Sequence, residues 1–160
     1  LGAQAVGLEG VEKRIDVISM AIQKGGTVFD LEEAELCYAP QFGSAKDPAN
    51  MAGMIAANVV RGDAQVFHWE DIEGGKGFLL DVRDPAELKS GLIDGAVNIP
   101  LNELRARMAE LPRDREIWAY CFVGQRSYVA ARALAQHGFR VRNLSGGYKL
   151  YALGKALRRD

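Results

Sequence analysis

Short apolar runs alternate with helical patterns through the second half of the chain, and this alternation leaves few possible folds. The apolar runs cover residues 78–83, 96–99, 117–120 and 139–143. Helix-start signals or helical spacing stand between and after these runs. Strands that alternate with helices in this way are typical of an α/β domain with a mainly parallel sheet. We therefore predict an α/β domain whose ligand crevice lies beyond the carboxyl ends of the strands.

The first sixty residues carry helical patterns without this alternation. Apolar residues recur at helical spacing over residues 11–24. Asp30 is expected to cap a second helix, because a glutamate follows three residues later as in a capping box. Asp47 followed by proline indicates the start of a third helix, which we expect to reach Arg61. These helices are too few to close a core, so we expect them to pack on another part of a protein.

The change of pattern near Asp63 divides the chain. We assign residues 1–62 to a mainly helical part, residues 63–75 to a linker and residues 76–160 to the α/β domain. A start at Leu1 rather than at methionine suggests a piece of a longer chain.

Composition excludes several classes of function. The 160 residues include 20 basic and 21 acidic side chains, so nothing indicates a nucleic-acid or anionic membrane partner. The apolar runs are too short to span a membrane, and no signal peptide is visible. A disulfide between Cys37 and Cys121 is not expected, which favours a reducing, cytoplasmic setting. His68 and His137 lack metal-ligand spacing with either cysteine, so no metal is expected.

Cys121 ends the apolar run 117–120 and directly precedes a helical pattern. Backbone N–H groups at a helix N-terminus point at an anion placed there, and they lower the pKa of a thiol. Arg126 adds a positive charge that does not deprotonate at working pH. We therefore predict that Cys121 is a nucleophile in an anion-binding loop. The alternative is a buried structural thiol, because cysteine is often buried for packing alone.

The second half of the chain resembles a rhodanese domain over about residues 64 to 157. The motifs that carry the resemblance are LDVRDPAEL from Leu80, GLIDGAVNIP from Gly91, CFVGQRS from Cys121 and NLSGGY from Asn143. Departures from the family pattern occur at Leu92 and Tyr151. Both lie outside the cysteine loop, so they leave the expected fold and activity unchanged.

The resemblance implies a rhodanese-like fold and a sulfurtransferase activity. The Cys121 thiolate would take sulfane sulfur from a donor, hold it as a persulfide and pass it to a thiol acceptor. Arg126 would close the loop and act with Cys121. The backbone amides around the persulfide would come from Phe122, Val123, Gly124, Gln125 and Ser127.

Two other functions remain open. Cysteine phosphatases of related fold also place a cysteine and an arginine around an anion, but with five residues between them. Four residues separate Cys121 from Arg126, which suits a single sulfur atom better than a phosphate. The second alternative is an inactive rhodanese-like module that senses persulfides or binds a partner.

The loop also indicates the class of donor. Phe122, Val123 and Gln125 are uncharged, so Arg126 is the only cation of the loop. A pocket specialised for thiosulfate would gather more positive charge around a dianion. We therefore expect a persulfide or polysulfide donor in preference to thiosulfate.

The first sixty residues resemble part of the dimerisation domain of flavin-dependent pyridine nucleotide–disulfide oxidoreductases of the coenzyme A-disulfide and persulfide reductase type. The runs that carry this resemblance are KRIDVI from Lys13, LCYAP from Leu36 and SAKDPANMAG from Ser44. In a full-length protein the resemblance implies FAD, NAD(P)H and coenzyme A as ligands, a homodimer, and a role for Tyr38 near the partner's flavin and coenzyme A. We expect this chain alone to bind neither FAD nor NAD, because no G-x-G-x-x-G follows a strand.

Overall fold

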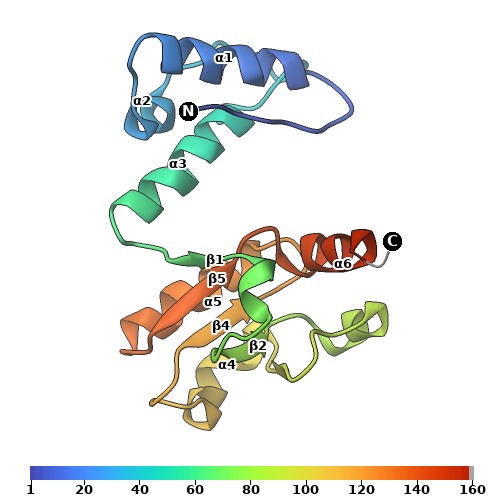
Figure 1. The fold of residues 1–160 in the computed structure, drawn as a ribbon. Coiled ribbons are helices and arrows are strands. Elements are labelled where there is room, and N and C mark those ends of the chain that lie inside the picture. Colours follow the sequence, from blue (N-terminus) through green and yellow to red (C-terminus); the bar gives the residue numbers. More distant parts are fainter. Residues whose placement is uncertain (159–160) are drawn as a thin grey trace. The chain divides into compact units, whose positions relative to one another are not determined.

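The computed structural model describes residues 1–158, which form two compact units divided after Gly62 (Figure 1). The first unit contains three helices: α1 (Val11–Gln23), α2 (Val28–Glu33) and α3 (Pro48–Val60). The second unit contains the sheet. None of the helices over residues 1–158 is long and apolar enough to cross a membrane.

The helix starts of the first unit differ from expectation at α2. Thr27, not Asp30, is the N-cap of α2, and Asp30 is the third helical residue of a capping box. The carboxylate of Asp30 accepts from the Thr27 backbone N–H at 2.6 Å, so the box begins three residues earlier than predicted. The start of α3 is as predicted, with Asp47 as N-cap and proline at the first helical position.

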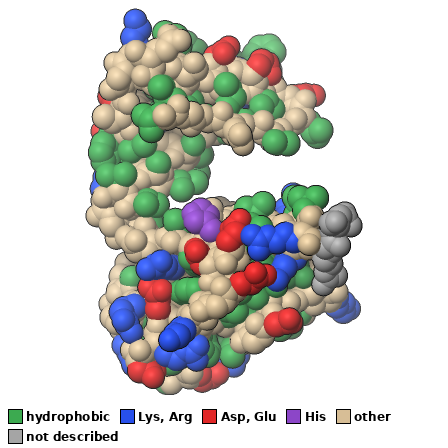
Figure 2. Space-filling model, in the orientation of Figure 1, with side chains coloured by type: hydrophobic (Ala, Val, Ile, Leu, Met, Phe, Trp, Pro, Cys, Tyr) green, Lys and Arg blue, Asp and Glu red, His purple; other side chains and the backbone are tan. Residues whose placement is uncertain are grey.

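The first unit lacks a core of large apolar side chains. Helices α1 and α2 have no buried residue, and α3 buries only Ala49, Asn50, Gly53 and Ala57. Figure 2 shows hydrophobic side chains exposed on the visible face of this unit. Ile55 of α3 is 61% exposed. The expectation that these helices cannot close a core by themselves is confirmed.

The second unit is built on a five-stranded sheet in the order β1-β5-β4-β2-β3. All four strand pairs are parallel, so the predicted α/β fold with a parallel sheet is confirmed. The strands are β1 (Val66–Phe67), β2 (Phe78–Asp81), β3 (Val97–Asn98), β4 (Ile117–Tyr120) and β5 (Val141–Leu144). The α-helices are α4 (Leu101–Arg107), α5 (Gln125–Gln136) and α6 (Gly147–Leu157). The 3₁₀ helices are η1 (Trp69–Ile72), η2 (Pro85–Ser90) and η3 (Met108–Glu110).

Residues 63–75 are not a linker, which corrects the expected boundary. They contribute β1, which pairs with β5, and η1, which packs on the sheet. Phe67 of β1 is 1% exposed and stacks on Trp118 of β4 at 4.7 Å. A two-residue strand gives little periodic signal, and only its pairing with β5 reveals it.

The central strand β4 is buried along its whole length and divides the core into two parts. Ile117 and Ala119 face the side covered by α4 and α5, where Leu80, Leu104 and Leu134 are among the buried residues. Trp118 and Tyr120 face the opposite side, which η1 and α6 cover. The sheet is therefore the middle of three layers, as expected when both faces of a parallel sheet are covered.

The sheet has a topological switch point between β2 and β4. The chain leaving β2 goes to β3 at one edge, whereas the chain leaving β4 goes to β5 on the other side. Ligand crevices of open parallel sheets lie at the carboxyl ends of the strands at such a point. The segments that follow β2 and β4 therefore meet where a site is expected, and Cys121 directly follows β4.

Candidate active site

Cys121 lies in a short turn between β4 and α5, and its residue is 1% exposed. Gly124 is the N-cap of α5 and has φ 104°, a left-handed conformation that a side chain would strain. This glycine lets the chain turn sharply enough to bring the first amides of α5 back over the cysteine sulfur. Gln125 and Arg126, expected in the loop, instead form the first turn of α5.

The sulfur of Cys121 is surrounded by hydrogen-bond donors of the turn. The Gly124 backbone N–H lies 3.1 Å from Sγ. The Ser127 hydroxyl oxygen lies 3.5 Å from Sγ and 3.2 Å from the Gly124 carbonyl oxygen. Because a hydroxyl has a single proton, Ser127 donates to one of these two acceptors at a time.

These donors favour the thiolate. Burial raises the pKa of the Cys121 thiol, but the Ser127 hydroxyl and the backbone N–H groups of Ser127, Gly124 and Val123 lower it by more. The pKa of Cys121 therefore lies below its ordinary value. Because the thiolate is the nucleophilic form of cysteine, this turn favours the reactive state of Cys121.

Replacing Ser127 by alanine should raise the pKa of Cys121, because it removes a hydrogen-bond donor to the thiolate. The alkylation rate with iodoacetamide follows the thiolate fraction, so the pH midpoint of alkylation should shift upward. Mass spectrometry of the Cys121 peptide separates this signal from Cys37, which is also a free thiol. A wild-type midpoint at or above about 8.5, the value of an ordinary thiol, would contradict the stabilised thiolate.

The guanidinium of Arg126 is bound by carboxylates. Its two terminal nitrogens lie 2.6 and 2.7 Å from the two oxygens of Glu87, and Nη1 lies 3.5 Å from Asp84. The hydrogen bond from Arg126 lowers the pKa of Glu87 to about 2, so Glu87 stays ionised. The sequence predicted that Arg126 offers its positive charge to the bound anion. In the structure this charge is instead paired with the carboxylates of Glu87 and Asp84.

The carbonyl group of Gly124, whose N–H faces the sulfur, is fixed by further hydrogen bonds. The Gly124 carbonyl accepts from Asn143 Nδ2 at 3.0 Å and from the Tyr128 backbone N–H at 3.0 Å, in addition to Ser127. Asn143 lies opposite Ala119 in the last residue pair between β4 and β5, close to the point where β4 leads into the cysteine turn. Sequence analysis did not single out this asparagine, and only the strand register places its side chain at the turn.

The start of α6 supports the other end of the turn. The carbonyls of Cys121 and Phe122 accept from the backbone N–H groups of Tyr148 and Lys149 at 2.8 and 3.0 Å. Gly147 has φ 60°, and a Cβ atom there would lie 2.6 Å from the Cys121 carbonyl oxygen. Gly147 is thus required for α6 to approach the cysteine turn so closely.

A buried ion pair supports the same region. The side chains of Asp81 and Arg83 are 0% exposed, and Arg83 Nη2 lies 2.6 Å from Asp81 Oδ2. Arg83 also donates to the Gly91 carbonyl at 2.8 Å and lies over the Tyr148 ring at 4.3 Å. These contacts join the end of β2 to the segment after it and to the start of α6, so the pair supports the fold around the cysteine turn.

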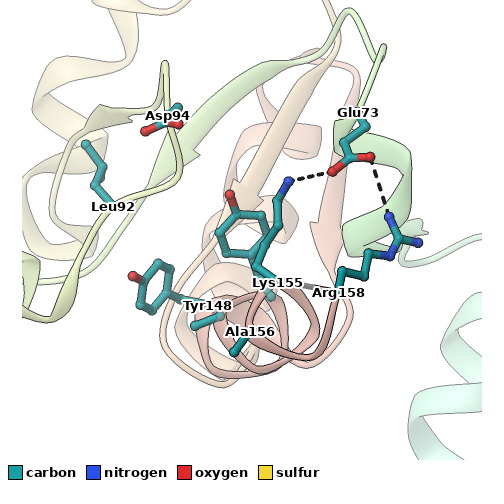
Figure 3. A pocket seen from close by; sticks show the side chains of 9 residues that line it. Glu73, Leu92, Asp94, Tyr148, Lys155, Ala156 and Arg158 are labelled. Carbon is teal, nitrogen blue, oxygen red and sulfur yellow. Dashed lines mark hydrogen bonds and ion pairs between the residues drawn. The ribbon is translucent and has the colours of Figure 1, made fainter. Parts of the chain in front are cut away.

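A separate hollow of about 640 Å³ lies beside α6 (Figure 3). Tyr148, Lys155 and Arg158 line it, together with Leu92 and Asp94. Both cations are bound to Glu73, and Cys121 is not part of the wall. Because Cys121 is not part of its wall, we assign the hollow no role in the chemistry.

The remaining predicted residues are distributed as follows. Phe122 and Val123 are 39% and 56% exposed beside the buried sulfur, so they offer an apolar rim.

Tyr38 lies in the first unit, exposed and outside any helix, and its expected role stays a prediction. Glu87 was missed, although its position three residues after Asp84 marks the capping box at the start of η2.

This α/β fold, with a cysteine in an amide-lined turn after its central strand, is that of the rhodanese-like domain. Residues 67–153 match the model of that family, and the chain belongs to it. A sulfurtransferase of Allochromatium vinosum is 44% identical over 75 residues, which are 46% of this chain and 70% of that protein.

Two solved structures match nearly the whole chain. The reduced CoADR-RHD of Bacillus anthracis is 50% identical, with a TM-score of 0.86 over 89% of this chain and 26% of that one. The NAD-dependent persulfide reductase of A. fulgidus is 38% identical, with a TM-score of 0.77 over 88% of this chain and 26% of that one. These shares exceed what the second unit alone could supply, so both resemblances inferred from the sequence are confirmed. This chain spans about a quarter of the length of either structure.

Proposed function

We propose that the second unit is a sulfurtransferase that carries sulfane sulfur as a persulfide on Cys121. The observation that carries this proposal is the position of Sγ, 3.1 Å from the Gly124 N–H and 3.5 Å from the Ser127 hydroxyl oxygen. A persulfide adds one sulfur atom to Sγ and carries a single negative charge at its end. A small turn lined by N–H and O–H donors suits such an anion.

The reaction is two successive thiolate displacements. The Cys121 thiolate attacks the terminal sulfur of a donor R–S–SH, a new S–S bond forms, and the donor S–S bond breaks to release R–S⁻. The terminal sulfur of the resulting cysteine persulfide loses its proton, and the donors of the turn bind the anion. An acceptor thiolate then attacks this terminal sulfur. A new S–S bond forms to the acceptor, and the S–S bond to Cys121 breaks, which restores the Cys121 thiolate. No external oxidant or reductant is required.

We propose persulfides or polysulfides as donors in preference to thiosulfate. Arg126 is the only cation of residues 121–127, and its charge is paired with Glu87. The exposed side chains of Phe122 and Val123 provide an apolar surface for the organic part of a persulfide.

In a longer protein we propose that this unit exchanges sulfur with a flavin- and NAD(P)H-dependent reductase of coenzyme A disulfides, persulfides or polysulfides. The likeness to CoADR-RHD and to the NAD-dependent persulfide reductase supports this assignment. The exposed apolar side chains of the first unit suit a homodimer interface.

Incubation with polysulfide should add about 32 Da, the mass of one sulfur atom, to the intact protein. The gain should be absent from Cys121→Ser and should persist in Cys37→Ser, because Cys37 is the other free thiol. Addition of a thiol such as glutathione should remove the extra mass. A wild-type protein that stays unmodified at Cys121 would refute the enzyme and favour an inactive interaction module.

A further inference from the structure

Arg126 and Glu87 form the only bidentate ion pair between the cysteine turn and the segment after β2 in the described chain. The two N–O distances are 2.6 and 2.7 Å, and Asp84 adds a longer contact at 3.5 Å to the same guanidinium. The Glu87 carboxylate also accepts from the Asp84 backbone N–H at 3.1 Å. This second bond fixes the carboxylate at the start of η2, so its position does not depend on Arg126 alone.

The ion pair lies at the switch point of the sheet. Glu87 belongs to η2, which follows β2, and Arg126 belongs to the first turn of α5, which follows β4. Strands β2 and β4 pair directly, with Asp81 opposite Tyr120 at their carboxyl ends. The two side chains therefore meet over the crevice in which the cysteine sulfur is approached.

The pair determines the net charge beside the sulfur. One guanidinium faces two carboxylates, those of Glu87 and Asp84, so this cluster has a formal charge of −1. The backbone amides and the Ser127 hydroxyl still stabilise one small anion at Sγ, but the side-chain cation of residues 121–127 is already paired with carboxylates. Thiosulfate is a dianion and releases sulfite, another dianion, whereas an organic persulfide releases a thiolate whose charge is on one sulfur.

We propose that Glu87 is a specificity-determining residue. It selects against thiosulfate because its ion pair with Arg126 neutralises the positive charge that a dianion would need. The inference rests on the proposed function, because it concerns which donor loads sulfur on Cys121. Glu87 acts through Arg126 and does not contact the sulfur, so it is a positioning residue. The distinctive consequence is a change in donor preference rather than a uniform change in rate.

The test compares kcat/KM for thiosulfate with kcat/KM for glutathione persulfide in the same preparation. Glu87→Gln removes the negative charge but keeps an amide oxygen, so it should raise the thiosulfate-to-persulfide ratio by about fivefold, the upper range for a partly exposed ion pair. Asp84→Asn should raise the ratio less, since its contact is longer. Added salt should reduce the gain, because it screens the freed charge.

The double variant Glu87→Gln/Arg126→Gln shows whether the effect passes through Arg126, and it should return the ratio to that of the wild type. A ratio that stays unchanged in Glu87→Gln, or a gain that survives the loss of Arg126, would overturn the inference. Because both donors are measured on one sample, a partly unfolded variant does not change the ratio. If wild-type Cys121 takes sulfur from neither donor, the proposed function itself fails, which is a different result from an unchanged ratio.

Discussion

Replacing Arg83 by alanine should lower the free energy of unfolding by about 3–5 kcal/mol, the cost of breaking a buried ion pair from one side. The substitution leaves the Asp81 carboxylate buried without its partner, since both side chains are 0% exposed. It also removes the hydrogen bonds from Arg83 to Ser90 and Gly91. The segment after β2 and the ring of Tyr148 at the start of α6 would lose a common anchor.

Urea denaturation measures this loss, and Arg107→Ala is the matched control. Arg107 also bonds two carboxylates, Glu103 and Glu110, but on the exposed surface. Its removal should cost far less, because water replaces the lost partner. The double variant Asp81→Leu/Arg83→Met should recover much of the stability, as apolar replacement of a buried pair often does. Equal losses for Arg83→Ala and Arg107→Ala would contradict the buried pair as a major stabilising contact.

Replacing Gly147 by alanine should lower the free energy of unfolding by about 2 kcal/mol or more and should impair sulfur loading on Cys121. A left-handed backbone costs an L-residue about 1–2 kcal/mol. The added Cβ would also lie 2.6 and 2.7 Å from the carbonyl oxygens of Cys121 and Phe122, so α6 or the cysteine turn must move. A shift of these carbonyls displaces the peptides that position the sulfur.

Gly95→Ala is the control that separates the two causes. Gly95 has φ 80°, but a Cβ there meets nothing within 4 Å, so only the backbone cost remains. We expect Gly95→Ala to keep the wild-type rate of Cys121 alkylation and Gly147→Ala to change it. If both variants lose the same stability and alkylate at the same rate, the close approach of α6 to the cysteine turn has no energetic or functional effect.

Structural features that depend on a few neighbouring residues could be predicted from the sequence. The apolar runs predicted β2, β3, β4 and β5, because parallel strands buried on both faces have continuous apolar character. The glycine, the arginine and the following helical spacing placed Cys121 at a turn with a lowered pKa. The capping box at α2 was misplaced by three residues, because Thr27 and Asp30 both suit the cap.

Features that depend on strand pairing across the sheet could not be predicted from the sequence. The strand β1 has only two residues and is recognisable only through its bonds to β5. Asn143 reaches the Gly124 carbonyl because β5 lies beside β4 in one particular register. Neither fact follows from local spacing, since strand order and register are set by how the whole core packs.

The sequence by itself determined the α/β class and the position of Cys121 in a short turn before a helix, because each depends on residues close together in the chain. Only the tertiary structure decided what becomes of the charge of Arg126. Glu87 is 39 positions away in sequence, and it meets Arg126 because β2 and β4 are neighbours whose chains leave in opposite directions. Long-range electrostatic pairing of this kind depends on topology, and here it turns an apparent anion-binding arginine into a neutralised one.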